Sequence, residues 1–427
     1  MNTQPYLESK KISRLVFMAC FAAYTASYVG RINYSAALPA IIGAGLFTKS
    51  QAGIIGSAFF FVYGAFQIIN GILSDRLSPF KMVIFGTAVS TFANVAMTFC
   101  TSNIAMALVW GFNGFALSFL WAAILKILAN LINDEMRDKA CLNICATLPV
   151  GTILAYLLAS LSIKFFNWKF VFYIPAIILA VVCIFFTASY RKAKSHITMR
   201  TVEAKIEMPQ AKAGASVKLL PLLAAAGIFL LLPADVIHGA IKEGITTWVP
   251  TMITEVYETE PSFSVFLSII LPIFNITGVY IITPIYKKIF KENEIKTAWV
   301  ILLFALIPLC ALIFLKKLPV VLSVALLAII TTSMHTYNYM IITLVPLRFA
   351  SQGKTATVTG IMNATAYVGC ALASYGFGVI SDKIGWTGSI IVWIALDAAA
   401  MLITVIATRG WTKYKNSLNK EGAAANV

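Results

Sequence analysis

Long apolar runs recur along the chain, and short polar or charged segments separate them. The hydrocarbon core of a bilayer is about 30 Å thick, so a helix that crosses it needs about 20 mostly apolar residues. The runs are too long, and their alternation too weak, for the strands of a membrane barrel. The pattern predicts twelve membrane-spanning helices, at residues 15–42, 51–73, 81–100, 104–131, 141–163, 170–190, 219–250, 262–286, 296–315, 319–345, 355–380 and 387–408.

The segment 191–218 is the only long polar stretch between predicted spans, and it divides them into six and six. We therefore expect an all-α integral membrane protein built of two six-helix halves. The predicted parts are an N-terminal bundle over 1–190, a cytoplasmic linker over 191–218, a C-terminal bundle over 219–408 and a cytoplasmic tail over 409–427.

Composition agrees with this class, because 59% of the residues are hydrophobic and only 12% are charged, whereas soluble domains carry about 25% charged residues. The net charge of +16 could indicate a nucleic-acid partner. Most of the 33 Lys and Arg residues, however, lie in loops on one predicted side, above all in 191–218, while the opposite loop 255–260 is acidic. This asymmetry predicts a multi-pass protein of the cell membrane with both termini in the cytoplasm and no nucleic-acid partner.

Catalytic and metal-binding motifs are missing from the sequence. The seven cysteines are scattered and form no Cys-x-x-Cys pair, so we interpret them as small packing residues. There is no P-loop, no dinucleotide-binding glycine pattern and no Gly-x-Ser-x-Gly. We expect a protein that is not an enzyme and that needs neither a cofactor nor a metal.

One arginine lies in the middle of the first predicted span. Arg31, in "GRINYSAALP", is followed eight residues later by Pro39. In the first span of the second half, Lys242 in "IKEGITTWVP" is followed eight residues later by Pro250. The repeated spacing favours two duplicated halves, an arrangement in which a transporter binds its substrate at the midplane between them.

A second motif, "GILSDRLSPFK" at 71–81, lies between the second and third spans. It resembles the cytoplasmic signature of the major facilitator superfamily. Gly71 allows two helix ends to approach closely, and Asp75 and Arg76 can exchange ion pairs there. We expect these two charged residues to act in a cytoplasmic gate, the alternative being an ordinary solvated turn.

Several helices together resemble the organophosphate:phosphate antiporter family of that superfamily, the glycerol-3-phosphate and hexose-phosphate transporter type. The resemblance implies a twelve-helix transporter of a small organic anion. The matching segments are "SYVGRINYSAALP" (27–39), "NGFALSFLW" (113–121), "IKEGITTWVPTMITEVY" (241–257) and "TGIMNATAYVGCALASYGFGVISDKIGW" (359–386).

Three positions depart from the pattern of that family. Lys242 stands where the family usually has an arginine, Gln67 replaces a basic residue of the second helix, and Leu148 aligns with a histidine of the fifth. The first two spans also resemble the anion:cation symporter family, which carries sugar acids and other carboxylates. The substrate is therefore either a phosphate ester or a carboxylate.

Arg31 is the first candidate for an anion clamp. A charge at the bilayer centre is costly and usually marks a transport pathway, and a guanidinium binds carboxylate or phosphate oxygens bidentately. The alternative is a structural ion pair. We expect Tyr28 and Asn33 of the same span, and Gln67 of the next, to contact the substrate as well.

Lys242 is the corresponding candidate of the second half, unless residues 219–237 alone span the membrane and leave it at the outer interface. Asp235 and His238 share its helical face, and Glu243 follows it directly. These acids either carry a coupling proton, which a buried carboxyl can hold near neutral pH, or serve as counter-charges to Lys242. We expect Asp235, His238 and Glu243 to act in coupling or gating.

Four further residues complete the predicted substrate site. Lys126 either lines the cavity or extends to the headgroups, and Trp121 lies on the same span. The cluster "SMHTYNY" contributes His335 and Asn338, for which hydrogen bonding between helices is the alternative.

The sequence thus predicts a monomeric secondary transporter that moves a small organic anion by alternating access. The expected partners are that anion, the lipid bilayer, and a coupling proton, sodium ion or counter-transported phosphate. The first alternative is a proton- or sodium-coupled symporter of sugar acids. The second is a membrane ligand sensor of the same fold.

Overall fold

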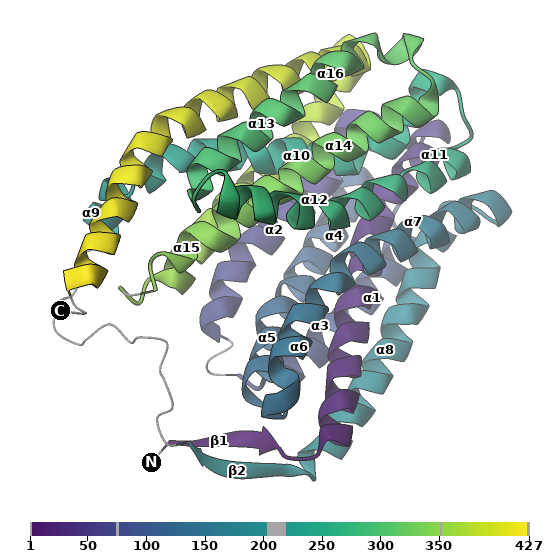
Figure 1. The fold of residues 1–427 in the computed structure, drawn as a ribbon. Coiled ribbons are helices and arrows are strands. Elements are labelled where there is room, and N and C mark those ends of the chain that lie inside the picture. The colour runs from purple at the N-terminus through teal and green to yellow at the C-terminus, as the bar shows by residue number, and fades with distance from the viewer. Residues whose placement is uncertain (1, 74–76, 203–218, 351, 425–427) are drawn as a thin grey trace. The chain divides into compact units, whose positions relative to one another are not determined.

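The computed structural model describes residues 2–73, 77–202, 219–350 and 352–424 (Figure 1). Nearly all of them are helical, as the apolar pattern predicts. The chain divides into two compact units. Unit 1 contains 1–205, 247–272 and 374–379, and unit 2 contains 206–246, 273–373 and 380–427.

The helices of the first half follow the first six predicted spans closely. Two of these spans are interrupted. The fourth consists of two helices, one that ends at Ser118 and one that begins at Leu120, and the fifth begins with a short separate helix before its main helix. The elements are α1 (Lys10–Gly43), α2 (Lys49–Leu73), α3 (Pro79–Met97), α4 (Asn103–Ser118), α5 (Leu120–Asn130), α6 (Asp134–Asn143), η1 (Ile144–Ala146), α7 (Thr147–Phe165) and α8 (Phe170–Lys194).

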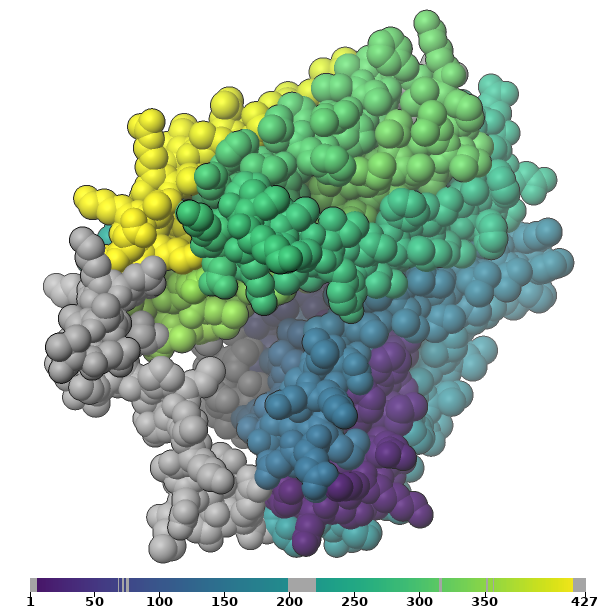
Figure 2. Space-filling model, viewed as in Figure 1, coloured from purple at the N-terminus to yellow at the C-terminus, as the bar shows by residue number. Residues whose placement is uncertain are grey.

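In unit 1, α1 packs against both α7 and α8, α2 packs against α4, and α3 packs against α4, α5 and α8. Figure 2 shows the atoms of α6 and α7 in blue beside those of α1 in purple. Because α1 lies between several helices, many of its residues are buried, although its apolar residues do not gather on one face of the helix. A helix that is enclosed on several sides needs no single apolar face.

A short antiparallel strand pair was not expected from the sequence. β1 (Asn2–Leu7) pairs with β2 (Ile197–Val202), so part of the predicted linker is an ordered strand. The backbone amide of Leu7 also donates to the carbonyl oxygen of Leu131 at 2.9 Å. These bonds tie the start of the chain to the end of α8 and to the segment after α5.

The second half contains the remaining spans, with more breaks than predicted. The expected span 219–250 is divided at Gly227, which adopts a positive φ of 71°, and helices 355–380 and 387–408 run together with a break at Gly385. The elements are α9 (Leu219–Ala225), α10 (Ile228–Tyr257), α11 (Pro261–Leu267), α12 (Ile270–Lys288), α13 (Glu294–Ala311), η2 (Leu312–Lys317), α14 (Val320–Asn338), η3 (Tyr339–Leu344), α15 (Val345–Leu347) and α16 (Thr355–Ala424).

The end of α10, with α11 and a short piece of α16, belongs to unit 1 because specific contacts join them to the first half. The ammonium of Lys49, the first residue of α2, lies 3.0 Å from a carboxylate oxygen of Glu255. The Ser374 hydroxyl of α16 donates to the carbonyl oxygen of Gly53 in α2 at 3.2 Å, and the indole of Trp248 donates to the carbonyl oxygen of Ser374 at 3.2 Å. The Ser160 hydroxyl donates to the carbonyl oxygen of Ser262 at 2.8 Å.

Within unit 2, α10 and α16 cross at small residues. An added Cβ at Gly239 would overlap the backbone of Ala366, and one at Gly369 would overlap the backbone of Val236. The thiol of Cys370 lies 3.5 Å from the carbonyl oxygen of Gly239. Small residues let membrane helices approach this closely, which agrees with the interpretation of Cys370 as a packing residue.

Nine helical stretches among the described residues are long and apolar enough to cross a membrane. The last of them, 357–417, contains the break at Gly385 and so covers two of the predicted spans. The helical content and the positions of these stretches agree with the predicted fold class.

Candidate functional site

Arg31 of α1 is surrounded by aromatic rings in unit 1. Its guanidinium carbon lies 5.5 Å from the ring centre of Tyr28, 5.4 Å from those of Phe59 and Phe60, and 5.1 Å from that of Tyr63. Ring faces attract a cation without neutralising its charge. The arrangement can therefore stabilise a charged guanidinium in a low-dielectric environment.

The ring cluster continues along α1 toward α5. Tyr28 contacts Tyr24 edge-to-face at 5.5 Å between ring centres, and Tyr24 lies 4.8 Å from Trp121. The structure thus connects three predicted residues, Arg31, Tyr28 and Trp121, through Tyr24. We define the aromatic cluster as Tyr24, Tyr28, Phe59, Phe60, Tyr63 and Trp121.

Sequence reasoning missed Tyr24, Phe59, Phe60 and Tyr63. For the last three the signal was the run "AFFFVYG" in the second span. Phe59 and Tyr63 stack at 5.7 Å because they lie one turn apart on the same face of α2.

Gln67 lies one turn beyond Tyr63 on α2. Its side-chain oxygen is buried, and it accepts no hydrogen bond from any residue that the structure describes. A buried amide oxygen without a donor costs free energy, so a substrate hydroxyl could supply the missing hydrogen bond. The prediction that Gln67 contacts substrate is compatible with this position.

Asn33 has contacts that favour a role in helix packing. Its amide nitrogen donates to Asn94 Oδ1 at 2.7 Å and to the carbonyl oxygen of Val171 at 3.1 Å, which joins α1 to α3 and α8. A neighbouring amide, that of Asn113, donates to the carbonyl oxygen of Gly30 at 2.9 Å. Substrate contact by Asn33 stays a prediction that these two bonds do not support.

For the remaining predicted residues of the first half, the structure gives little information about a role. Lys126 lies in α5 and is half-buried. Asp75 and Arg76, expected at the gate, lie outside the described residues.

Gly151 of α7 allows that helix to pass directly against Tyr28. A Cβ at this position would lie 2.5 Å from Tyr28 Cβ and 2.8 Å from the carbonyl oxygen of Thr25. Gly151→Ala should therefore displace Tyr28 from Arg31, lower the melting temperature, since overpacking costs about 1–3 kcal/mol, and reduce uptake. Gly360→Ala is the matched control, because no described atom lies within 4 Å of its added Cβ. Equal behaviour of the two variants would contradict the prediction.

A buried acid–histidine pair lies in unit 2. His238 Nδ1 lies 3.4 Å from Asp235 Oδ1, one turn away on α10, and both side chains are fully buried. His238 Nε2 lies 3.1 Å from the carbonyl oxygen of Met334 on α14, and the ring of Tyr337 lies 4.9 Å from the imidazole. Neither carboxylate oxygen of Asp235 accepts a hydrogen bond from a described residue. Such a pair can take up and release a proton.

Lys242 lies near the middle of α10, because that helix runs from Ile228 to Tyr257. This position argues against the alternative in which 219–237 alone spans the membrane and Lys242 lies at an interface. Its charge acts on Asp235, His238 and His335, but it forms no ion pair with any residue that the structure describes. Glu243 is buried beside it, and its Oε1 has no donor among the described residues.

His335 and Asn338 lie at the end of α14, where the helix changes type. Residues Tyr339–Leu344 form a π-helical turn (η3) directly after Asn338. Turns of this kind occur often at functional sites, so the turn is compatible with a functional role of His335 and Asn338. The sequence carries no signal for the turn.

No group of three His, Cys, Asp or Glu side chains gathers in the described part of the chain. Asp235 and His238 form a buried pair that could serve proton exchange.

Known proteins give the chain its family. The model of the Major Facilitator Superfamily matches residues 20–374. The glycerol-3-phosphate transporter of Bacillus subtilis is 24% identical over 96% of this chain and 94% of its own length. A probable hexose phosphate transport protein of Chlamydia trachomatis is 21% identical over 95% and 92%. The membrane sensor protein UhpC of Salmonella typhimurium is 30% identical over 25% of this chain and 24% of its own.

Solved structures confirm the fold. A bacterial homolog of the human lysosomal transporter Spinster matches with a TM-score of 0.80 at 15% identity, over 95% of this chain and 99% of that one. The nucleoside transporter NupG matches with a TM-score of 0.69 at 16% identity, over 94% and 99%. The chain belongs to the major facilitator superfamily, a family of transporters and not of enzymes, and it resembles the organophosphate:phosphate antiporter type within it.

Proposed function

We propose that this protein is a secondary transporter that carries a small phosphate ester, such as a glycerol phosphate or a hexose phosphate, across the cytoplasmic membrane. The transport of sugar phosphates by relatives of nearly equal length supports the substrate class. We further propose that both termini face the cytoplasm, because the basic loops follow the positive-inside rule.

The observation that carries the proposal is the aromatic cluster around Arg31. A guanidinium held by ring faces keeps its charge and its planar set of donors, which match phosphate oxygens bidentately. Rings also pack well against the carbon skeleton of a sugar or of glycerol. The cluster therefore offers both parts of a phosphate ester a suitable surface.

Lys242 is the second cation that the sequence predicts for the anion. A compact ammonium binds an anion as a point charge without a fork, so it accepts phosphate and carboxylate alike. No described acid lies within ion-pair distance of Lys242, so its charge is only partly compensated within unit 2. An incoming anion would supply the compensation, and this gives anion binding a driving force.

A second candidate function, a proton-coupled symporter of carboxylates, is favoured by the buried pair Asp235–His238. Protonation of this pair would change the charge beside Lys242 and could couple proton movement to anion binding. A phosphate antiporter needs no such step, since the counter-anion itself drives exchange.

Transport by the purified protein in liposomes tests the proposal. We expect liposomes loaded with inorganic phosphate to take up labelled glycerol 3-phosphate or glucose 6-phosphate at least ten times faster than glucuronate, because a guanidinium attracts a doubly charged anion more strongly than a singly charged one. A protonophore should leave this exchange unchanged. Uptake of glucuronate alone, stopped by the protonophore, would establish the symporter instead. Binding of a phosphate ester without measurable flux would contradict transport and favour a ligand sensor.

A further inference from the structure

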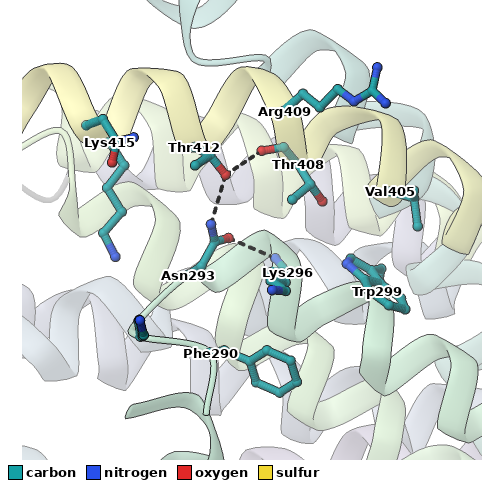
Figure 3. A pocket seen from close by; sticks show the side chains of 11 residues that line it. Phe290, Asn293, Lys296, Trp299, Val405, Thr408, Arg409, Thr412 and Lys415 are labelled. Atoms are coloured by element: carbon teal, nitrogen blue, oxygen red, sulfur yellow. Dashed lines mark hydrogen bonds between the residues drawn. The ribbon is translucent and has the colours of Figure 1, made fainter. Parts of the chain in front are cut away.

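A cavity of about 590 Å³ lies in unit 2 between the start of α13 and the last turns of α16 (Figure 3). We propose that this α13–α16 pocket binds the phosphate headgroup of an anionic phospholipid. Its cationic side chains are Lys291, Lys296, Arg409 and Lys415. The proposal stands apart from the transported substrate and does not depend on its identity.

The charge in the pocket is strongly one-sided. None of the residues that line it is acidic, and within the described ranges Lys291, Lys296 and Arg409 form no ion pair. Four cations that line one cavity give it a positive potential, although Lys291, Lys296 and Arg409 are exposed to solvent. The pocket therefore has an electrostatic preference for a negatively charged ligand.

The two acidic residues nearest in sequence already have partners elsewhere. Arg348 Nη2 lies 2.7 Å from Glu294 Oε1 and 3.4 Å from Glu292 Oε2. The Trp411 indole donates to Glu294 Oε2 at 3.0 Å. These acids are engaged mainly with Arg348 and Trp411, and among the cations of the pocket they also act on the charge of Lys415.

The loop before α13 is held in an unusual backbone conformation at the pocket. Lys291 and Glu292 both have positive φ, 50° and 58°, a conformation that is unfavourable at residues other than glycine. The side-chain amide of Asn293 donates to the Thr412 hydroxyl at 3.0 Å, and this bond joins the loop to α16. Lys415 donates to the carbonyl oxygen of Glu292. Strained backbone that neighbours hold in place is typical of ligand sites.

The wall of the pocket and the surface next to it point to a lipid. Trp299 lines the cavity, and tryptophan is enriched where membrane meets water. Farther along the two helices, Leu303 and Phe304 of α13 and Leu402 and Ile406 of α16 are exposed. A lipid whose phosphate lies in the pocket would thus find exposed apolar side chains on both helices for its acyl chains, which a soluble phosphate does not need.

The location agrees with the distribution of lipids. The pocket lies where the apolar stretches 294–314 and 357–417 begin and end, on the side predicted to be cytoplasmic. Anionic lipids attract clustered Lys and Arg at that surface, and basic pockets between helices there bind lipid headgroups.

Lipid binding by the purified full-length protein tests the proposal. We expect cardiolipin and phosphatidylglycerol, added to detergent micelles, to raise the melting temperature, and phosphatidylcholine to have no such effect. The double variant Lys296→Gln/Arg409→Gln should weaken the apparent affinity for cardiolipin about thirtyfold, because each cation near an anionic surface contributes about one factor of five. Arg191→Gln/Lys194→Gln removes the same charge from the exposed end of α8 and should leave the affinity unchanged.

Two results would overturn the proposal. Equal weakening by both double variants would mean that surface charge in general attracts the lipid. Equal stabilisation by inorganic phosphate, lost in Lys296→Gln/Arg409→Gln, would assign the pocket to a soluble anion. If the double variant does not fold, the single variants Lys296→Gln and Arg409→Gln are compared by native mass spectrometry, where each should retain fewer cardiolipin molecules than wild type.

Discussion

Replacing Arg31 by alanine or by lysine should abolish uptake of the phosphate ester, while the protein still reaches the membrane in normal amount. Loss of one partner of a buried charge pair costs about 2–5 kcal/mol, which corresponds to a loss of at least about thirtyfold in transport efficiency. Lysine keeps the charge but lacks the planar fork of donors. Because the aromatic cluster fits around a flat guanidinium, we expect Arg31→Lys to be nearly as inactive as Arg31→Ala.

Initial uptake rates in proteoliposomes, with protein amount determined by blotting, measure this effect. Arg191→Ala is the control, because Arg191 is exposed at the end of α8. A loss of binding can be separated from a loss of folding by comparing melting temperatures with and without glycerol phosphate, since a ligand stabilises the state that it binds. Full transport by Arg31→Ala would refute the proposed anion clamp.

Replacing Glu294 by alanine should cause the largest loss of stability among the residues considered. Glu294 is fully buried. Its Oε1 accepts from Tyr286 at 2.8 Å and from Arg348 Nε at 2.7 Å, and its Oε2 accepts from Trp411 at 3.0 Å. Its removal leaves the Tyr286 hydroxyl and the Trp411 indole without their acceptor, at about 1–3 kcal/mol for each buried group, and leaves Arg348 with Glu292 alone among the described acids. We expect a marked fall in the melting temperature, measured at one fixed heating rate.

Glu292→Ala provides a closely matched control for Glu294→Ala. The Glu292 carboxylate contacts the same arginine, Arg348, at 3.4 Å, but half of its side chain is exposed. Exposed ion pairs contribute about 0–1 kcal/mol, so this variant should melt almost as the wild type does. If the two variants melt at the same temperature, the buried network around Glu294 does not carry the stability assigned to it.

The positions of the helices could be predicted well because the thickness of the bilayer sets their length. The breaks inside them could not all be predicted. Gly227 and Gly385 are glycines and offered a signal, whereas the change from α4 to α5 at Phe119 has neither glycine nor proline. The pair β1–β2 joins segments almost 200 residues apart, and local patterns do not reveal such partners.

Only those residues of the candidate site could be predicted whose chemistry is unusual by itself, without knowledge of their neighbours in the fold. The cost of a charge in an apolar run identified Arg31, but the rings around it come partly from α2, and a sequence does not show which face of one helix meets another. A buried asparagine looks the same whether it binds substrate or another helix, and the contacts of Asn33 favour the helix. The lysines of the α13–α16 pocket looked like ordinary positive-inside charges.

The π turn after Asn338 has a consequence for comparing this chain with its relatives. A turn with i→i+5 bonds takes in one more residue than an α-helical turn, so the face of the helix changes by about 100° between residues before Tyr339 and those after Leu344. A relative with a regular helix in this place would match across it only with a one-residue gap. Alignments without that gap would assign equivalent residues wrongly from Val345 onward.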